Sequence, residues 1–316
     1  MKVQVIGSSF FALNVMQRFA VSPLLKYLDV SLISRSFADS SGDKFCLESL
    51  GKTYKVSLVT GGGASSEIFE LVQEFGPDVL FCLGWNHLLG PNVLDVARIA
   101  SIGYHPSMLP MGRGRSPIIW AIVLGLRETG SSFFELSVEP DAGGLISQEK
   151  VSISKEETSS SLYAKLIQIG YTQFTKIVEQ ILSHGKIFPV NQVEAFSTTW
   201  RRRDERDGTI DFRMSAVCID RLVRALTWPY PSATIPLIDP AASLFVVGSR
   251  VGSDTEKTGL EPGKVISIDN FWIHVKAGGN STIWLKLAED VATSDFLHSV
   301  EGTQQYFLPR SGSAPP

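Results

Sequence analysis

The stretch Asp78-Val-Leu-Phe-Cys-Leu-Gly84 is an unbroken apolar run that ends on a glycine. A short run of this kind is typical of a β-strand that is covered on both faces, as in a parallel sheet between two layers of helices. Earlier in the chain, residues 3–6 and 29–34 have strand patterns, whereas residues 10–19 and 66–75 have helical spacing. This alternation predicts right-handed crossovers and an α/β fold with a Rossmann-like, mostly parallel sheet.

The second half of the chain has a different pattern. A long amphipathic helix is predicted over residues 159–183, and the composition changes after Pro189. Short elements follow between turn residues: a helix over 215–226 and strands over 244–247, 264–268, 272–276 and 283–287. We expect a first domain over residues 1–195 and a smaller, β-rich, OB-like domain over 196–316. The second domain would hold a linker helix, a small antiparallel barrel and a frayed tail from residue 304.

Composition excludes several classes of protein. The 316 residues are 44% hydrophobic and 19% charged with a net charge of -3, which is ordinary for a globular protein and gives no basic field to recruit nucleic acid. The three cysteines, Cys46, Cys82 and Cys218, form no CxxC pair, so we expect neither a disulfide framework nor a metal site. The composition is therefore typical of a soluble globular protein without a structural metal.

No segment has the pattern of a membrane span or a targeting signal. The longest apolar run, residues 118–126, is much shorter than the roughly 20 residues that a span needs, and it predicts a buried helix. The first residues enter a strand pattern directly, without a charged leader and an apolar signal region. We therefore expect a cytoplasmic protein without a membrane partner.

Two loops are predicted to leave neighbouring strands at the same edge of the sheet. The segment Trp85-Asn-His-Leu-Leu89 follows the apolar strand, and His105 ends the next strand, directly before Pro106. Ligands of such sheets bind beyond the carboxyl ends of the strands. Asp141 lies in a tight turn between Pro140 and two glycines. His105 and Asp141 are either a catalytic pair, with a carboxylate that makes the imidazole more basic, or Asp141 is a capping or ion-pairing residue of its turn.

Two glycine-rich segments do not carry a phosphate-binding pattern. Gly7-Ser-Ser-Phe10 follows a strand but lacks the second and third glycines of the dinucleotide motif. Gly61-Gly-Gly63 lacks the Gly-Lys-Ser/Thr ending of a phosphate loop. We interpret the first as a strand-to-helix turn and the second as a flexible loop.

Five longer motifs resemble the folate-dependent formyltransferases. They are His105-Pro-Ser-Met-Leu-Pro-Met-Gly-Arg-Gly-Arg-Ser-Pro-Ile-Ile-Trp-Ala121, Gly125-Leu-Arg-Glu-Thr-Gly130, Asp141-Ala-Gly-Gly-Leu-Ile-Ser-Gln148, Arg203-Asp-Glu-Arg-Asp-Gly-Thr-Ile-Asp-Phe212 and Arg221-Leu-Val-Arg-Ala-Leu-Thr-Trp-Pro-Tyr-Pro-Ser-Ala233. The family includes methionyl-tRNA formyltransferase, glycinamide ribonucleotide formyltransferase and enzymes that formylate nucleotide-linked amino sugars. The resemblance implies transfer of a formyl group from 10-formyltetrahydrofolate, the co-substrate, to a primary amine.

The resemblance also implies a catalytic set of asparagine, histidine and aspartate. His105 and Asp141 match the histidine and the aspartate, but Gly103 stands where the family has the asparagine. Three interpretations remain: a backbone amide or a water replaces the missing donor, Asn86 supplies it from the neighbouring loop, or activity is lost. Asn86 is our leading candidate because both loops leave the same edge, although it is also a typical solvent-facing turn residue.

The folate contacts that the resemblance implies lie in three loops, and an apolar slot with polar partners suits a flat heteroaromatic ring. They are Trp85, His87, Leu88, Met108, Arg113, Ser137, Glu139 and Pro140. The alternative for Leu88 is a role in core packing.

The distribution of basic residues indicates which amine receives the formyl group. A partner of tRNA is expected to have a basic surface, whereas the only dense basic run, Arg201-Arg-Arg203, is followed by Asp204, Glu205 and Asp207. We therefore expect a nucleotide-linked amino sugar, as used in surface polysaccharides, with Trp200, Trp228 and Tyr230 either stacking on its base or packing between domains. Methionyl-tRNA formyltransferase and a non-catalytic folate- or sugar-binding relative are the alternatives. An exposed strand or helix of the second domain could pair two chains as a homodimer.

Overall fold

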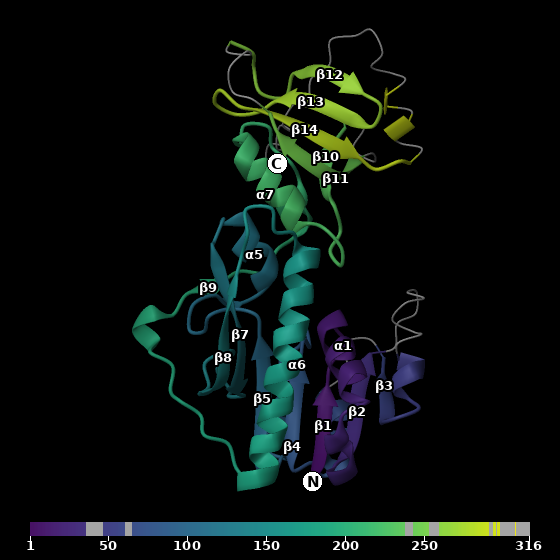
Figure 1. The fold of residues 1–316 in the computed structure, drawn as a ribbon, viewed down its shortest axis with the longest axis vertical. Coiled ribbons are helices and arrows are strands. Elements are labelled where there is room, and N and C mark those ends of the chain that lie inside the picture. Colours follow the sequence, from purple (N-terminus) through teal and green to yellow (C-terminus); the bar gives the residue numbers. More distant parts are fainter. Residues whose placement is uncertain are drawn as a thin grey trace, which may run out of the picture. The chain divides into compact units, whose positions relative to one another are not determined.

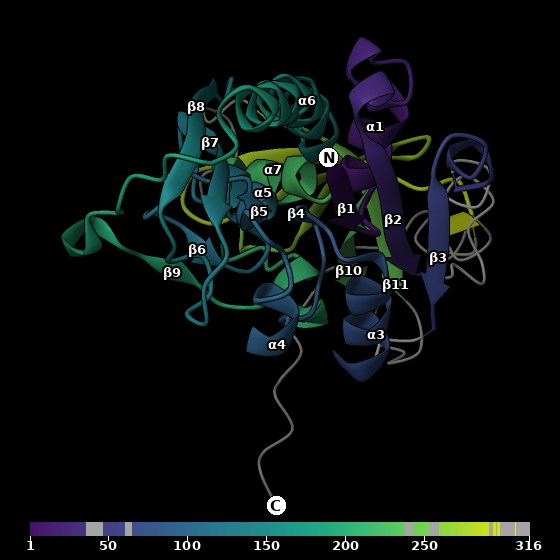
Figure 2. The same ribbon diagram turned by 90° about the horizontal axis from the view of Figure 1, so that it is seen from below.

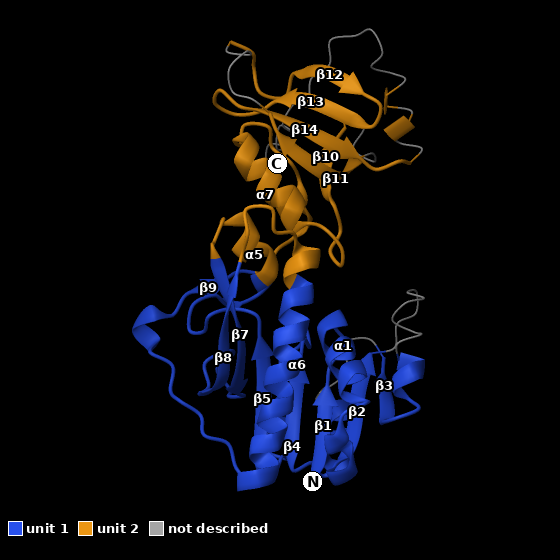
Figure 3. Cartoon of the chain, in the orientation of Figure 1, with its two compact units in different colours: residues 1–117, 128–152, 163–201 blue, residues 118–127, 153–162, 202–316 orange. Residues whose placement is uncertain are grey.

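The computed structural model describes residues 1–35, 47–60, 65–237, 243–252, 259–290, 293–294, 296–297 and 307. The chain divides into two compact units (Figure 3). The first consists of residues 1–117, 128–152 and 163–201, and the second of residues 118–127, 153–162 and 202–316. The domain boundary expected after residue 195 stays a prediction. Cys46, Gly61-Gly-Gly63 and the expected tail, apart from Phe307, lie outside the described residues.

The first unit is built on a seven-stranded sheet with the order β3-β2-β1-β4-β5-β7-β8 (Figure 1). Neighbours from β3 to β5 are parallel, whereas β7 runs antiparallel to β5 and to β8. The chain reverses its direction of winding between β1 and β4, which places the loops after these strands at the usual ligand edge. The strands are β1 (Lys2–Ile6), β2 (Asp29–Arg35), β3 (Lys55–Val59), β4 (Val79–Leu83), β5 (Ala100–His105), β7 (Glu128–Glu135) and β8 (Leu145–Ser152).

Helices cover both faces of this sheet. Figure 2 shows α1 (Phe10–Phe19) and α6 (Ser159–His184) on one face, and α3 (Ser65–Phe75) and the short α4 (Pro91–Leu94) on the other. Helix α1 begins where the Ser9 side chain accepts a hydrogen bond from the Ala12 amide, as an N-cap should. A 3-10 turn, η1 (Pro23–Tyr27), leads into β2. This arrangement confirms the predicted Rossmann-like α/β class.

A buried aromatic cluster joins the helical layer to the sheet. The Phe174 ring of α6 lies with its centroid 5.0 Å from that of Phe19 in α1 and 4.6 Å from that of Phe81 in β4. All three side chains are inaccessible to solvent. Edge-to-face and tilted contacts at these distances add to the free energy gained by burial.

The second unit contains an antiparallel sheet with the order β10-β11-β14-β13-β12. Its strands are β10 (Ala233–Pro236), β11 (Ser243–Val251), β12 (Val265–Asp269), β13 (Trp272–Lys276) and β14 (Thr282–Leu287). Helix α7 (Ala216–Ala225) buries Ile219, Leu222 and Val223 and contacts β11 and β14. The unit also includes most of helix α5 (Pro117–Val123) and the 3-10 turn η3 (Glu205–Gly208). The predicted β-rich second part is therefore present, whereas closure into a barrel stays a prediction.

Within the part of the chain that the structure describes, no helix combines the length and the apolarity that crossing a membrane requires.

Replacing Phe174 with alanine should lower the free energy of unfolding by about 3–5 kcal/mol, because it empties the centre of the aromatic cluster. Urea titration followed by circular dichroism measures the change. Lys176→Ala, at an exposed position on the same helix, is the control and should shift the free energy by no more than about 0.5 kcal/mol. Equal stability of the two variants would show that this cluster does not hold α6 on the sheet.

Candidate active site

His105 is the last residue of β5 and lies at the edge of the sheet where the parallel strands end. Its side chain is buried, and Nε2 lies 2.8 Å from the carbonyl oxygen of Gly112. A carbonyl oxygen can only accept a hydrogen bond, so Nε2 carries a proton in either charge state of the ring. Nδ1 is therefore the ring nitrogen that can take up or release a proton.

Asp141 lies beside this free nitrogen, with Oδ2 3.7 Å from His105 Nδ1. The same carboxylate oxygen accepts a hydrogen bond from the Gly114 amide at 2.9 Å. The Asp141 backbone has a φ of 59°, in the left-handed region that residues other than glycine seldom adopt. The structure thus brings the two predicted residues together, while the catalytic role of the pair stays a prediction.

Polar side chains of β7 and β8 hold the loop that follows His105. Ser132 donates a hydrogen bond to the Ser107 carbonyl at 2.6 Å, and Thr129 donates one to the Pro106 carbonyl at 3.2 Å. Gln148 donates to the Leu109 carbonyl at 2.9 Å. Sequence reasoning missed these residues, because the polar stretches of β7 and β8 show no alternation that would mark them as strands.

A late segment, residues 189–200, runs beside both loops, and we refer to it as the strap. It contains the 3-10 turn η2 (Glu194–Phe196), and its last two residues form β9 (Thr199–Trp200), which pairs in parallel with β6 (Arg113–Gly114). The Thr198 side chain accepts a hydrogen bond from the Gly112 amide at 2.9 Å. Gly112 has a φ of 71°, and a β-carbon there would lie 2.5 Å from the Trp200 ring, so a side chain could not be accommodated.

Arg113 joins the strap to the loop after His105. Its buried guanidinium donates to the two carboxylate oxygens of Glu194 at 3.0 and 2.8 Å and to Gln192 Oε1 at 3.0 Å. Glu139, predicted as a folate contact, lies 3.8 Å from the same guanidinium. Hydrogen bonds from Arg113 hold the pKa of the Glu194 carboxyl below its usual value. The role of Arg113 as a folate contact stays a prediction. Its hydrogen bonds to Glu194 and Gln192 join it to the strap.

The loop after β4 presents mostly exposed residues. Asn86, His87 and Leu88 are exposed, and Leu88, at 71%, does not take part in core packing. Asn86 makes no hydrogen bond to His105 or Asp141 within the described residues, so its role as the third catalytic group stays a prediction. The Trp85 ring packs against the apolar cluster beneath the loop, and its indole nitrogen is buried without a hydrogen-bond partner in the part of the chain described.

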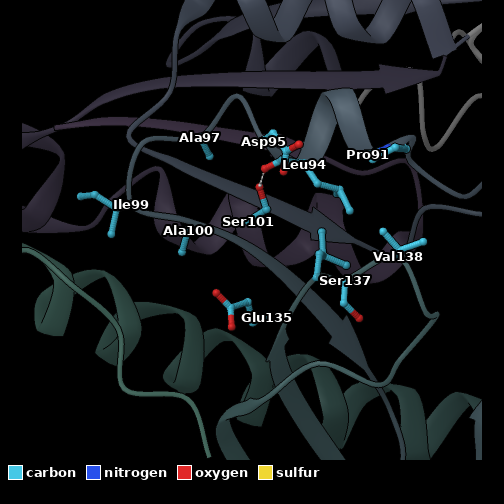
Figure 4. Close-up of a pocket in the computed structure, with 11 residues that line it drawn as sticks. Pro91, Leu94, Asp95, Ala97, Ile99, Ala100, Ser101, Glu135, Ser137 and Val138 are labelled. Atoms are coloured by element: carbon cyan, nitrogen blue, oxygen red, sulfur yellow. Dashed lines mark hydrogen bonds between the residues drawn. The ribbon is translucent and has the colours of Figure 1, made fainter.

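A groove opens between α4 and the segment that follows β7 (Figure 4). Its volume is about 340 Å³, at the lower end of the range for small-molecule sites. Its lining consists of Pro91, Leu94, Asp95, Ala97, Ile99, Ala100, Ser101, Glu135, Leu136, Ser137 and Val138. Of the predicted folate contacts only Ser137 belongs to this lining; Met108 and Pro140 lie outside it.

Gly103 has a steric reason to lack a side chain. A β-carbon at this position would lie 2.7 Å from Leu136 Cδ2 and 2.8 Å from the Phe134 ring. The residue paired with Gly103 on the neighbouring strand is Cys82. Desolvation, with the nearby Asp141 carboxylate, raises the pKa of the Cys82 thiol to about 12, so the thiol stays neutral at physiological pH.

Comparison with known proteins places both parts of the chain. Residues 55–178 match the family described as formyl transferase, and residues 203–298 match the formyl transferase C-terminal domain. The chain belongs to the formyl transferase family, as the sequence motifs predicted.

Individual relatives refine this placement. The bifunctional polymyxin resistance protein ArnA of Wigglesworthia glossinidia brevipalpis is 30% identical over 207 residues, which are 66% of this chain and 31% of ArnA. The chain thus spans about a third of the length of this curated relative.

Two solved structures share the fold at 17% identity. One is WlaRD, a sugar 3N-formyl transferase studied in the presence of dTDP and 5-N-formyl-THF (TM-score 0.66, covering 92% of this chain and 99% of WlaRD). The other is an N-formyltransferase from Helicobacter canadensis in complex with folinic acid and dTDP-3-aminofucose (TM-score 0.64, 91% and 100%).

Restoring the family asparagine through Gly103→Asn should lower the free energy of unfolding by about 1–3 kcal/mol, because the space is filled by Phe134 and Leu136. Urea titration measures this loss. Gly185→Asn is the matched control, since nothing lies within 4 Å of its β-carbon position and asparagine tolerates the positive φ found there. A Gly103→Asn protein as stable as the wild type would refute the steric explanation.

Proposed function

We propose that this protein transfers a formyl group from 10-formyltetrahydrofolate to the primary amine of a nucleotide-linked amino sugar, with dTDP or UDP as the nucleotide. The observation that carries the proposal is the pair of His105 and Asp141 at the carboxyl edge of a formyl transferase sheet. Membership of the family supports the reaction type, and the two solved sugar N-formyltransferases support the class of acceptor.

The reaction sets clear demands on the site. A bond forms between the amine nitrogen and the formyl carbon, and the bond from that carbon to the folate nitrogen breaks. The amine must lose a proton, the departing nitrogen must gain one, and negative charge develops on the formyl oxygen. 10-Formyltetrahydrofolate supplies the formyl group.

His105 and Asp141 suit these demands. The Gly112 carbonyl fixes the proton on Nε2, so His105 exchanges protons through Nδ1. In the protonated ring, Nδ1–H can donate to the developing oxyanion. The Asp141 carboxylate, held by the Gly114 amide, stabilises the imidazolium and accepts a proton from the attacking amine. Together the two side chains can move a proton between the two nitrogens.

The groove beside α4 is a suitable site for the pterin ring of the folate. The groove beside α4 combines apolar atoms of Leu94, Leu136 and Val138 with the hydroxyls of Ser101 and Ser137, which suits a flat ring with polar edges (Figure 4). Outside the lining of this groove, the buried indole N–H of Trp85 is a donor without an acceptor among the described residues. A bound ligand or a water would satisfy it.

One arginine of the main basic run is engaged within the protein, and acidic residues follow the run, which together argue against tRNA as the acceptor. Arg203 donates to the Asp207 carbonyl at 2.6 Å, and its guanidinium lies 6.0 Å from the centroid of the Trp120 ring. Asp204 caps the turn η3 and accepts a hydrogen bond from the Arg206 amide. The guanidinium of Arg203 is therefore engaged within its own unit, and the net charge of -3 adds no basic surface.

A mass-spectrometric screen of dTDP- and UDP-linked amino sugars with 10-formyltetrahydrofolate tests the proposal. We expect at least one sugar to gain a formyl group in exchange for a hydrogen. Charged initiator tRNA is screened in parallel. Formylation of the tRNA alone would overturn the sugar assignment, and folate binding without turnover of any acceptor would favour a non-catalytic relative.

His105→Ala and Asp141→Asn should each lower kcat at least about 100-fold, because each removes a group that moves a proton in the reaction. Stopped assays on the sugar found in the screen give kcat, and equilibrium binding of tetrahydrofolate gives the control, which should be unchanged. Turnover within a few-fold of wild type in either variant would remove that residue from the catalytic set.

A further inference from the structure

We infer that Gln192 of the strap is a positioning residue that fixes the Asp141 carboxylate beside His105. The inference deepens the proposed function and rests on it for the reaction, but not for the geometry. Gln192 is 51 residues from Asp141 in sequence and lies in a segment that none of the quoted motifs includes.

The first argument is the pair of hydrogen bonds that Gln192 makes. Its Nε2 donates to the carbonyl oxygens of Asp141 and Gly143, each at 2.8 Å. One amide group thus ties both ends of the turn that carries the carboxylate. The neighbouring strap residue Val190 exchanges two backbone hydrogen bonds with Leu145, at 2.7 and 2.8 Å, directly after this turn.

The second argument is the backbone conformation of Asp141. A non-glycine residue with a φ of 59° lies in the sparsely populated left-handed region and keeps this conformation only when its surroundings impose it. The turn has little room to relax, since a β-carbon on Gly143 would lie 1.8 Å from the Glu135 carbonyl oxygen. The two bonds from Gln192 act on the strained residue itself and on its second neighbour.

The third argument is the orientation of the Gln192 amide. Arg113 donates to Oε1 at 3.0 Å, so the oxygen faces the guanidinium and the NH₂ group must face the two carbonyls. Glu194 holds Arg113 by two hydrogen bonds, which fixes the guanidinium in turn. A series of hydrogen bonds therefore leads from Glu194 through Arg113 and Gln192 to the backbone of Asp141.

The strap also reaches His105. Thr198 accepts from the Gly112 amide, and the Gly112 carbonyl is the acceptor for His105 Nε2. One segment thus supports both members of the pair, and the 3.7 Å between Nδ1 and Oδ2 depends on it.

Gln192→Glu is the sharpest variant. It keeps the size of the side chain and the contact with Arg113, but it turns a carboxylate oxygen toward two carbonyl oxygens. Gln192→Ala removes both contacts and serves as the second variant. Val193→Ala, at a strap position that is 57% exposed, is the matched control.

The first readout needs no substrate. The Gly114 amide donates to Asp141 Oδ2, so its hydrogen exchange in the full chain reports whether the carboxylate is in place. We expect exchange about tenfold faster in both Gln192 variants and unchanged in the control. Wild-type protection of Gly114 in both Gln192 variants would overturn the inference.

The second readout is kinetic. With the sugar identified in the screen, kcat should fall by about 10- to 100-fold in Gln192→Glu, while the KM values of both substrates stay within about threefold, because only the geometry of the pair changes. A rise in KM with kcat unchanged would assign Gln192 to binding and contradict the positioning role. If the wild-type chain formylates no acceptor, the proposed function fails, and the Gly114 exchange alone decides the inference.

Discussion

The hydrogen bond between His105 Nε2 and the Gly112 carbonyl is the constraint from which the rest of the site follows. Because it fixes the proton on one ring nitrogen, it leaves the other free to face Asp141. The carbonyl can occupy this place only because Gly112 adopts a positive φ beside the Trp200 ring, where a side chain would collide. Backbone conformation, rather than a further charged group, thus sets the protonation pattern of the histidine.

Much of the fold follows from hydrophobic periodicity. The helix predicted over residues 10–19 and the strand predicted over residues 272–276 have those bounds in the structure, since each shows a regular pattern between clear end signals. The apolar run at 78–84 contains the strand β4, Val79–Leu83. Strands β7 and β8 were missed because Thr129–Ser132 and Ser147–Lys150 are polar on both faces, so no alternation marks them.

The candidate site was only partly visible in the sequence. His105 and Asp141 could be found because each lies next to residues that break regular structure and because the motifs point to them. The contacts that hold them were hidden for a physical reason: they run between side chains and backbone amides or carbonyls, and these backbone groups have the same chemistry at every residue. Gln192 and Gly143 are 49 positions apart, and no local pattern links them.

The strap has a consequence for the order in which the protein matures. Residues 189–200 lie between the two matched segments. The segment that matches the formyl transferase family ends at residue 178, and the segment that matches its C-terminal domain begins at residue 203. During synthesis the sheet strands and α6 leave the ribosome before the strap does. A nascent chain can therefore pair all seven strands while Asp141 still lacks the contacts that hold its turn. The order of synthesis thus allows the sheet to form before the pair of side chains is arranged.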